Sequence, residues 1–221
     1  MHQYRGKLIV HTGSMFSGKT SSLWKEVNRF KIAKYNVVVF KPKMDSRYSK
    51  EKVVTHDKNE IEAINVDNID DIVEYTKTHD VNVIAIDEVQ FINSKADHFV
   101  KQINYLLEKG FTIIAAGLDM DYKAKPFQLV KELLPICDYV EKHHAVCAVC
   151  GNDAWVSYRI SDDKNRIQLG ASEAYMPLCR KHYIEKMNEK KLTELQTTYL
   201  DKDKKIKTQF SITKLCFFYS G

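Results

Sequence analysis

The stretch that decides the fold is Gly13-Ser14-Met15-Phe16-Ser17-Gly18-Lys19-Thr20, which matches the pattern GxxxxGK[ST] in full. Residues 7–11, just before it, are mostly apolar and predict a strand, and residues 19–30 have a helical pattern. A strand, a glycine-rich turn and a helix in this order form a phosphate-binding loop, whose backbone N–H groups converge on phosphate oxygens. In such a loop Lys19 supplies charge to the β- and γ-phosphates, and the Thr20 hydroxyl is a ligand for Mg²⁺.

Alternating strand and helix patterns fill the first 140 residues. Apolar runs that suit buried parallel strands lie at 7–11, 37–40, 83–86 and 112–116, and helical patterns lie near 19–30, 69–78 and 94–109. We therefore expect an α/β domain of the P-loop NTPase type (RecA-like) over residues 1–140, with a mostly parallel sheet and helices on both faces. In the last helix Ser94 and Asp97 resemble a capping box, and Gly110 stands where a C-terminal glycine belongs.

Two acidic residues follow one of these strands directly. The apolar run 83–86 leads into Asp87 and Glu88. In open parallel sheets ligands bind at the carboxyl ends of the strands, so we expect Asp87 to hold Mg²⁺ directly or through water. Glu88 is then a second carboxylate, which either orients an attacking water or accepts a proton from a substrate hydroxyl.

The sequence changes character after about residue 140, where paired cysteines appear. Two knuckles, Cys147-Ala148-Val149-Cys150 and Cys179-Arg180-Lys181-His182, offer three thiolates and one imidazole. Four protein ligands complete the tetrahedral shell of Zn²⁺ and indicate a structural metal. The 28 residues between the knuckles exceed the common spacing of about 15–20, so a redox CxxC and unrelated buried thiols are the alternatives.

The chain after residue 140 divides into two parts. We interpret residues 141–184 as a small zinc-binding lobe that carries a substrate-binding loop, and residues 185–221 as an amphipathic helix and a tail. The adjacent His143 and His144 are expected at the surface.

The composition is that of an ordinary globular protein. The 221 residues are 44% hydrophobic and 29% charged, and 34 Lys+Arg against 29 Asp+Glu give a net charge of +5. This surplus fits nucleic acid, nucleotides or a solvated surface. The sequence shows no signal segment and no apolar run near the ~20 residues that a spanning helix needs, and its five cysteines are an odd number. We expect reduced thiols, a cytoplasmic location and no membrane partner.

Three classes of nucleotide-dependent protein compete for these parts. The absence of an NKxD element argues against a GTPase. Asp87-Glu88-Val89-Gln90 would suit a DExQ helicase, but 221 residues do not supply a second ATPase lobe. An adenylate-kinase-like enzyme has the right size, yet its phosphate loop is spaced differently. A nucleic-acid-stimulated ATPase and another nucleoside or nucleotide kinase with a zinc lid remain alternatives.

Several motifs together resemble the type II thymidine kinases, the group found in animals, many bacteria and poxviruses. They occur in the family's order at 15–20, 45–48 (Asp-Ser-Arg-Tyr), 55–59 (Thr-His-Asp-Lys-Asn), 86–91, 117–119, 125–127 and the two knuckles. The resemblance runs from about Lys7 to Tyr183. It implies transfer of the γ-phosphate of ATP to the 5′-hydroxyl of thymidine or deoxyuridine, giving dTMP for DNA synthesis. It also implies a homotetramer, feedback by thymidine triphosphate, and no nucleic-acid partner.

The resemblance further assigns roles to single residues, with Glu88 as the general base. The residues expected around ATP and its Mg²⁺ are Gly13, Ser14, Met15, Phe16, Ser17, Gly18, Lys19, Thr20, Asp87 and Arg47. Those expected around the nucleoside are Met15, Gln90, Phe91, Leu118, Tyr122, Phe127, Ser157, Arg159, Gln168, Gly170 and Tyr175. Tyr122 takes the place of a Phe that stacks on the base, and the loop at about 168–175 grips the base with main-chain atoms. His182 replaces a cysteine of the animal members, a change that zinc tolerates.

Overall fold

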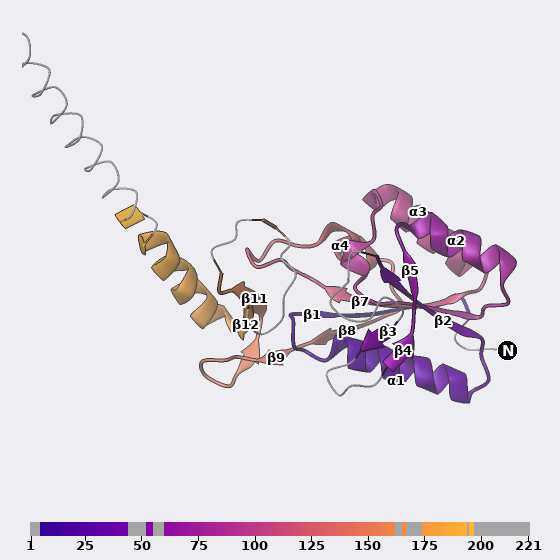
Figure 1. Cartoon of the computed structure of the whole chain (residues 1–221), viewed down its shortest axis with the longest axis horizontal. Coiled ribbons are helices and arrows are strands. Elements are labelled where there is room, and N and C mark those ends of the chain that lie inside the picture. The colour runs from indigo at the N-terminus through magenta and orange to yellow at the C-terminus, as the bar shows by residue number, and fades with distance from the viewer. Residues whose placement is uncertain are drawn as a thin grey trace, which may run out of the picture. The chain divides into compact units, whose positions relative to one another are not determined.

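Figure 1 shows the computed structural model of the chain, which describes residues 5–43, 52–54, 60–161, 165–166, 174–193 and 195–196. The chain separates into two units, residues 1–179 and 180–221. In the described part of the first unit, six strands form one parallel sheet in the order β5-β2-β6-β7-β1-β8. The strands are β1 (Leu8–Gly13), β2 (Val37–Pro42), β5 (Ile64–Val66), β6 (Val83–Ile86), β7 (Thr112–Leu118) and β8 (Tyr139–His143).

Helices cover both faces of this sheet, as Figure 1 shows. They are α1 (Lys19–Ile32), α2 (Ile69–Thr78), α3 (Ala96–Glu108) and α4 (Gln128–Leu133), with a short 3-10 helix η1 (Val89–Phe91). Helix α1 lies on one face, where its buried Leu23, Val27 and Phe30 join Ile9 of β1 in a core. The other three helices lie on the opposite face, in a second core that includes Val10 of β1. Successive residues of β1 therefore point to opposite faces, as in any strand.

The predicted fold class is confirmed: this is an α/β domain with a parallel sheet between two layers of helices. The four predicted strands correspond to β1, β2, β6 and β7, whose residues are almost all buried. The two edge strands were not predicted. β5 has only three residues, and four of the five residues of β8 are exposed, so neither gives a continuous apolar run.

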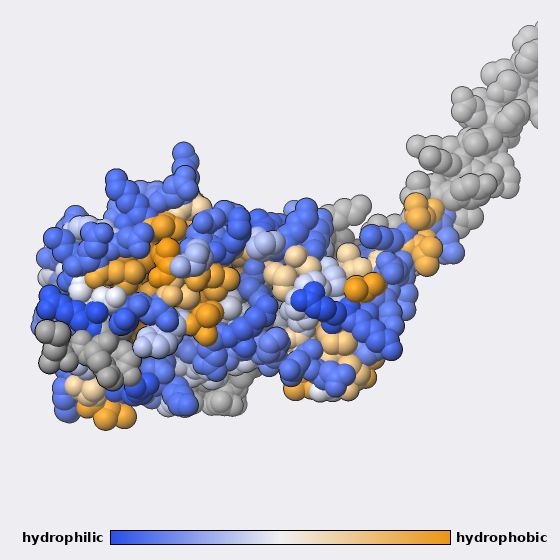
Figure 2. Space-filling view, turned by 180° about the vertical axis from the view of Figure 1, so that it is seen from behind, coloured by the Kyte–Doolittle hydropathy of each residue, from blue (hydrophilic) through white to orange (hydrophobic). Residues whose placement is uncertain are grey.

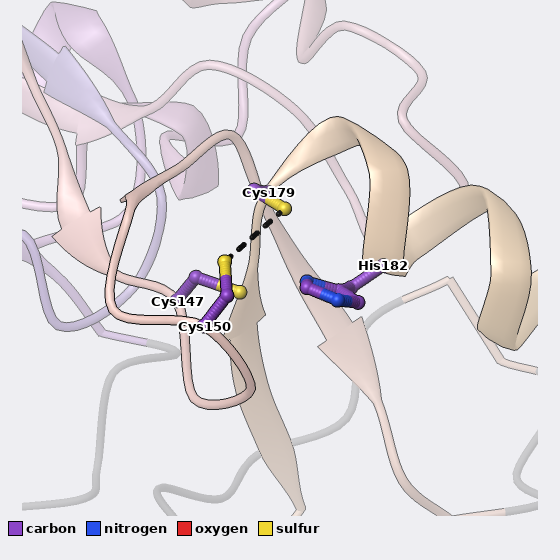
Figure 3. A group of neighbouring side chains, drawn as sticks. All are labelled: Cys147, Cys150, Cys179 and His182. Carbon is purple, nitrogen blue, oxygen red and sulfur yellow. Dashed lines mark hydrogen bonds between the residues drawn. The ribbon is translucent and has the colours of Figure 1, made fainter.

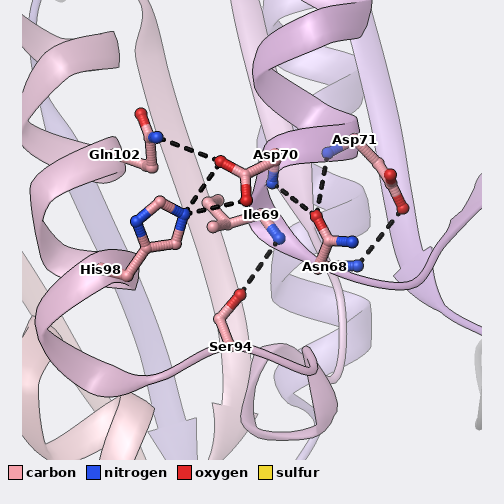
Figure 4. A network of polar contacts seen from close by, with 7 residues as sticks. All are labelled: Asn68, Ile69, Asp70, Asp71, Ser94, His98 and Gln102. Carbon is pink, nitrogen blue, oxygen red and sulfur yellow. Dashed lines mark hydrogen bonds and ion pairs between the residues drawn. The ribbon is translucent and has the colours of Figure 1, made fainter.

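The expected capping box at Ser94 and Asp97 is wrong. α3 begins at Ala96, and its N-cap residue Lys95 makes no side-chain capping bond. Instead, the Ser94 hydroxyl accepts a hydrogen bond from the backbone N–H of Ile69 at the start of α2 (3.3 Å; Figure 4). The serine therefore stabilises the neighbouring helix.

A capping box does occur at the start of α2. The Asn68 side chain accepts the backbone N–H groups of Asp70 and Asp71, and the Asp71 carboxylate accepts the N–H of Asn68. Asp70 in turn accepts hydrogen bonds from His98 (2.9 Å) and Gln102 (3.0 Å) of α3, so one network joins both helices (Figure 4).

Three pairs of short antiparallel strands complete the described part of the first unit. They are β3 (Lys52–Val54) with β4 (Glu60–Glu62), β9 (Ala145–Val146) with β10 (Asp153–Ala154), and β11 (Val156–Arg159) with β12 (Tyr175–Leu178). The sequence also predicts short strands at 155–160 and 167–169. The first corresponds to β11, and the second lies outside the described residues.

The described part of the second unit, by itself, is a helix over residues 180–193. Among the described residues, no helix is both long and apolar enough to cross a membrane. The face shown in Figure 2 is mostly hydrophilic, with apolar side chains gathered in one larger area.

Candidate active site

The phosphate-binding loop connects the end of β1 to the start of α1. Gly13 lies so close to β8 that a Cβ atom would stand 2.1 Å from the carbonyl oxygen of His143, so only glycine fits there. Gly18 adopts a left-handed conformation (φ 84°) just before the helix, which again favours glycine. The Lys19 ammonium donates to the carbonyl of Ser14 (2.6 Å), and the Ser17 hydroxyl donates to the same oxygen (2.8 Å). The loop thus holds its own lysine over the turn, where phosphate oxygens would compete for it.

Two oxygen-bearing side chains face each other beside this loop. The hydroxyl of Thr20, in the first turn of α1, lies 3.3 and 3.4 Å from the two carboxylate oxygens of Asp87. Asp87 follows β6 and is 5% exposed. A hydroxyl and a carboxylate are hard oxygen donors of the kind that Mg²⁺ prefers, so this pair is chemically suited to that ion.

Glu88 is held in a strained conformation next to this pair. Its backbone is left-handed (φ 49°, ψ 42°), which is uncommon for a residue with a side chain, and its N–H donates to Asp87 (3.0 Å). Gln90 donates a short hydrogen bond to the Glu88 carboxylate and accepts one from the N–H of Leu118 (3.0 Å). Because the Gln90 oxygen would stand 2.6 Å from a Cβ at Gly117, a glycine is needed there. Strain at a single carboxylate with such support is typical of functional sites.

The segment expected to contact the nucleoside approaches the phosphate loop through Ser157. This residue of β11 is 4% exposed, and its hydroxyl accepts the backbone N–H of Met15 (2.8 Å). These two residues are 142 positions apart in the chain, and the family resemblance assigns both to the nucleoside pocket; in the structure they are in direct contact.

Arg159 stands at the centre of a cluster of aromatic residues and is 1% exposed. Its guanidinium lies 3.8 Å from the ring centroid of Tyr122 and donates to the hydroxyl of Tyr175 (2.7 Å). It also donates to the carbonyls of Asn165 and Arg166. The structure thus brings together Tyr122, Arg159 and Tyr175, with the arginine bonded to protein atoms.

The loop that carries Tyr122 is fixed by a buried carboxylate. Asp121 is 5% exposed and accepts the backbone N–H groups of Lys123 (2.9 Å) and Lys125 (3.0 Å) and the side chain of Arg166 (2.9 Å). Close by in sequence, Phe127 meets Phe91 edge to face, with ring centroids 6.0 Å apart. Of the other predicted residues, Arg47, Gln168 and Gly170 lie outside the described residues.

The two knuckles come together as the spacing predicts. The potential ligand atoms of Cys147, Cys150, Cys179 and His182 all lie within 4.8 Å of one another, and the sulfurs of Cys150 and Cys179 are 3.9 Å apart (Figure 3). Three thiolates and one imidazole at such distances are compatible with a structural zinc.

Comparison with known proteins identifies the family of this chain. A family model described as thymidine kinase matches residues 6–183, which is most of the chain. The chain belongs to the thymidine kinase family. This membership supports a phosphotransferase of the nucleoside kinase type. Among solved structures, the flagellar accessory protein FlaH from Methanocaldococcus jannaschii has a TM-score of 0.47 and 12% identity, over 67% of this chain and 75% of that one.

One expectation about this member of the thymidine kinase family is wrong. His143 was expected at the surface, but its side chain is only 10% exposed, because β8 lies beside β1 and the imidazole turns toward His11. Burial, and next the charge of His143, lower the pKa of His11 from its ordinary value, against the carboxylates of Glu141 and Glu26. Burial also lowers the pKa of His143, with Glu141 opposing and Lys19 contributing. His144 is exposed, as expected.

Several buried charged residues and residue pairs belong to none of the motifs in the sequence. Asp121 and Lys41 are buried charged residues, but neither belongs to a motif that was recognised. His11 and Glu141 stand 130 positions apart, and only the pairing of β1 with β8 brings them together. A buried charged residue at the end of a predicted strand, as Lys41 is in β2, was the one available hint.

Proposed function

We propose that this protein is an ATP-dependent thymidine kinase, which transfers the γ-phosphate of ATP to the 5′-hydroxyl of thymidine, and of deoxyuridine, to give the monophosphate for DNA synthesis. The observation that carries the proposal is the convergence of Lys19, Thr20, Asp87 and Glu88 at the carboxyl ends of β1 and β6 in a chain of the thymidine kinase family. Parallel sheets bind ligands at this edge.

The phosphate loop and the pair Thr20–Asp87 would bind ATP with its Mg²⁺. Lys19 leaves the Ser14 carbonyl for the β- and γ-phosphates, and the loop residues 13–18 surround these groups with N–H donors. The Thr20 hydroxyl and the Asp87 carboxylate would hold the ion, which when bound neutralises charge on the phosphates. Arg47 is proposed to contact the phosphates as well.

Glu88 would accept the proton of the 5′-hydroxyl, and Gln90 would position it. The carboxylate stands directly after Asp87, so it lies beside the proposed phosphate site. Gln90 fixes one oxygen of Glu88 against the end of β7 through Leu118. Proton transfer depends on such positioning, since a general base must stay within hydrogen-bond reach of its substrate.

The nucleoside would lie between the phosphate loop and the cluster around Arg159. We propose that Tyr122 stacks on the base, and that main-chain atoms at 168–175 bind its polar edge. The residues proposed to complete the pocket are Met15, Gln90, Phe91, Leu118, Phe127, Ser157, Gln168, Gly170 and Tyr175. A pocket for the 5-methyl group discriminates by only ~1–3 kcal/mol, so deoxyuridine is expected to be a weaker second substrate.

The zinc-binding lobe, proposed to span 141–184, would support this pocket. Zn²⁺ bound by Cys147, Cys150, Cys179 and His182 would be structural, because four protein ligands leave no position open for substrate. By analogy with its family we also propose a cytoplasmic homotetramer that thymidine triphosphate inhibits.

A panel of nucleosides with labelled ATP tests the proposal. Thymidine is expected to be phosphorylated best, deoxyuridine about 5–150-fold less efficiently, and purine nucleosides not at all. Equal efficiency for thymidine and deoxyuridine would show that the site has no pocket for the 5-methyl group. ATP hydrolysis that rises with single-stranded DNA, without nucleoside phosphorylation, would instead support the nucleic-acid-stimulated ATPase.

A further inference from the structure

A second cluster of metal-binding side chains lies at the base of the phosphate loop, apart from the cysteine knuckles. His11 is in β1, and Glu141 and His143 are in the neighbouring strand β8. His11 pairs with Glu141 and Gly13 with His143 in this parallel ladder. Side chains two positions apart in a strand share a face, so all three point to the face of the sheet that α1 covers.

The three potential ligand atoms form a compact triangle. His11 Nδ1 lies 3.0 Å from His143 Nε2 and 3.5 Å from Glu141 Oε2, and His143 Nε2 lies 3.7 Å from the same oxygen. Two ligands of a tetrahedral Zn²⁺, each at about 2.0–2.2 Å, stand about 3.3–3.5 Å apart. A hydrogen bond between the two imidazoles would explain the 3.0 Å between their nitrogens. It would not explain why a carboxylate oxygen also lies within 3.7 Å of both of these nitrogens.

The surroundings of the cluster leave one side open. The side chains of His11 and His143 are 5% and 10% exposed, whereas that of Glu141 is 64% exposed. An ion held by the three atoms would therefore have a fourth position on the solvent side, next to Glu141. The carboxylate of Glu26 in α1 adds negative potential at His11, and Lys19 adds positive potential at His143.

We propose that His11, Glu141 and His143 form a second metal site, which binds one divalent first-row transition ion such as Zn²⁺ or Co²⁺ and leaves one coordination position open. Two imidazoles exclude Mg²⁺ and Ca²⁺, which take oxygen ligands. This proposal does not depend on the proposed kinase activity, because it rests only on the pairing of β1 with β8.

This site would bind its ion more weakly than the cysteine knuckles would bind zinc. Histidine ligands are usually oriented by a hydrogen bond at their second ring nitrogen, and losing that bond costs 10–100-fold in affinity. His11 Nε2 is buried and has no hydrogen-bond partner within the described ranges. Lys19 also opposes a cation here, so the ion is expected to exchange with solvent.

The test is a titration of the full-length, reduced, zinc-containing protein with Co²⁺, followed by metal analysis and visible absorption. We expect one zinc to remain and one cobalt to bind, with cobalt d–d bands but without the near-ultraviolet charge-transfer bands of thiolate ligands. No bound cobalt, or cobalt that enters with thiolate bands only, would overturn the proposal.

Matched variants locate the ion. Glu141→Gln changes an exposed side chain and should keep the fold, yet it is expected to weaken Co²⁺ binding about tenfold or more. His143→Gln should abolish binding, and the adjacent exposed His144→Gln should leave it unchanged. Unchanged Co²⁺ binding in both Glu141→Gln and His143→Gln, with melting temperatures like that of the parent protein, would show that the cluster is not a metal site.

Discussion

The phosphate side and the base side of the candidate active site are built in different ways. The phosphate side uses two short continuous segments, 13–20 and 87–88, which the backbone itself places at the end of a strand. The proposed base side takes most of its side chains from segments between Gln90 and Tyr175, and some of their contacts are between side chains, such as Arg159 on Tyr122. A local turn can be recognised in a sequence, whereas a pocket assembled from distant segments depends on how those segments pack.

Two of the described contacts join the two sides. Ser157 accepts the N–H of Met15 in the phosphate loop, and Gln90 connects Glu88 with Leu118. Substitutions on either side should therefore affect one substrate more than the other, and those at the contacts should affect catalysis itself.

The largest effect is expected from Glu88→Gln, on the phosphate side. Loss of the general base should lower kcat by about 10²–10⁴-fold, while ATP binding is retained because the phosphate loop and Asp87 are untouched. Steady-state kinetics and an ATP-binding measurement check this. Glu108→Gln, at the exposed end of α3, is the matched control. If Glu88→Gln turned over at close to the rate of the parent protein, Glu88 would not be the general base.

The next effect is expected from Arg159→Lys, on the base side. Lysine cannot reproduce the fork that binds the Asn165 and Arg166 carbonyls and the Tyr175 hydroxyl. Leaving a buried polar group unsatisfied costs about 1–3 kcal/mol. We expect the KM for thymidine to rise about 10–100-fold and the KM for ATP to stay unchanged.

Kinetics with each substrate varied in turn separate the two constants for this variant. Arg29→Lys on the exposed surface of α1 is the control. If the KM for ATP rose by the same factor, Arg159 would act on the phosphate side as well. The two sides would then not be functionally separate.

Gln90→Met should have a smaller effect, at a contact between the two sides. The change keeps the size of the side chain but removes the donor to Glu88 and the acceptor for the Leu118 N–H. We expect kcat to fall about tenfold, in line with the ~1–3 kcal/mol cost of lost hydrogen bonds, with little change in either KM. A raised KM for thymidine with an unchanged kcat would instead make Gln90 a residue that only binds the base.

The smallest effect concerns the sheet that carries both sides. Asp138 precedes β8 and accepts hydrogen bonds from the N–H of Leu8 (2.9 Å) and from Lys7 (3.0 Å). Burial opposes the charge of Asp138, but these donors outweigh it and hold its pKa below the ordinary value. The folded state therefore binds the proton less readily than the unfolded chain, so this stability is present near neutral pH and is lost as the pH falls through the acidic range.

Asp138→Asn is expected to lower the free energy of unfolding at pH 7 by roughly 0.5–1 kcal/mol. The difference from the parent protein should shrink below about pH 4, where the carboxyl is protonated in the unfolded chain. Urea unfolding at several pH values measures this. Kinase activity per folded molecule should not change, and a loss of activity would mean that the edge strand β8 contributes to the site directly.

The sequence predicted the centre of the fold better than its margins. β1, β2, β6 and β7 are buried on both faces and give continuous apolar runs, whereas β5 and β8 at the edges do not. The capping box was misplaced because Ser94 bonds to a helix 25 residues earlier in the chain, a partner that local pattern cannot reveal. The expectation that His143 lies at the surface fails for a similar reason, since its burial depends on the pairing of β8 with β1.

By itself, the sequence determined the chemistry that lies in continuous segments. The phosphate loop, the acids after β6 and the potential metal ligands of the two knuckles are each set by spacing along the chain, because a tight turn or a strand end fixes the positions of neighbouring residues. Only the tertiary structure decided that Gln90 supports Glu88, that Ser157 contacts Met15 and that His11 meets His143. These contacts arise when segments distant in sequence pack side by side. The local sequence around each of these residues does not identify the residue that it will contact.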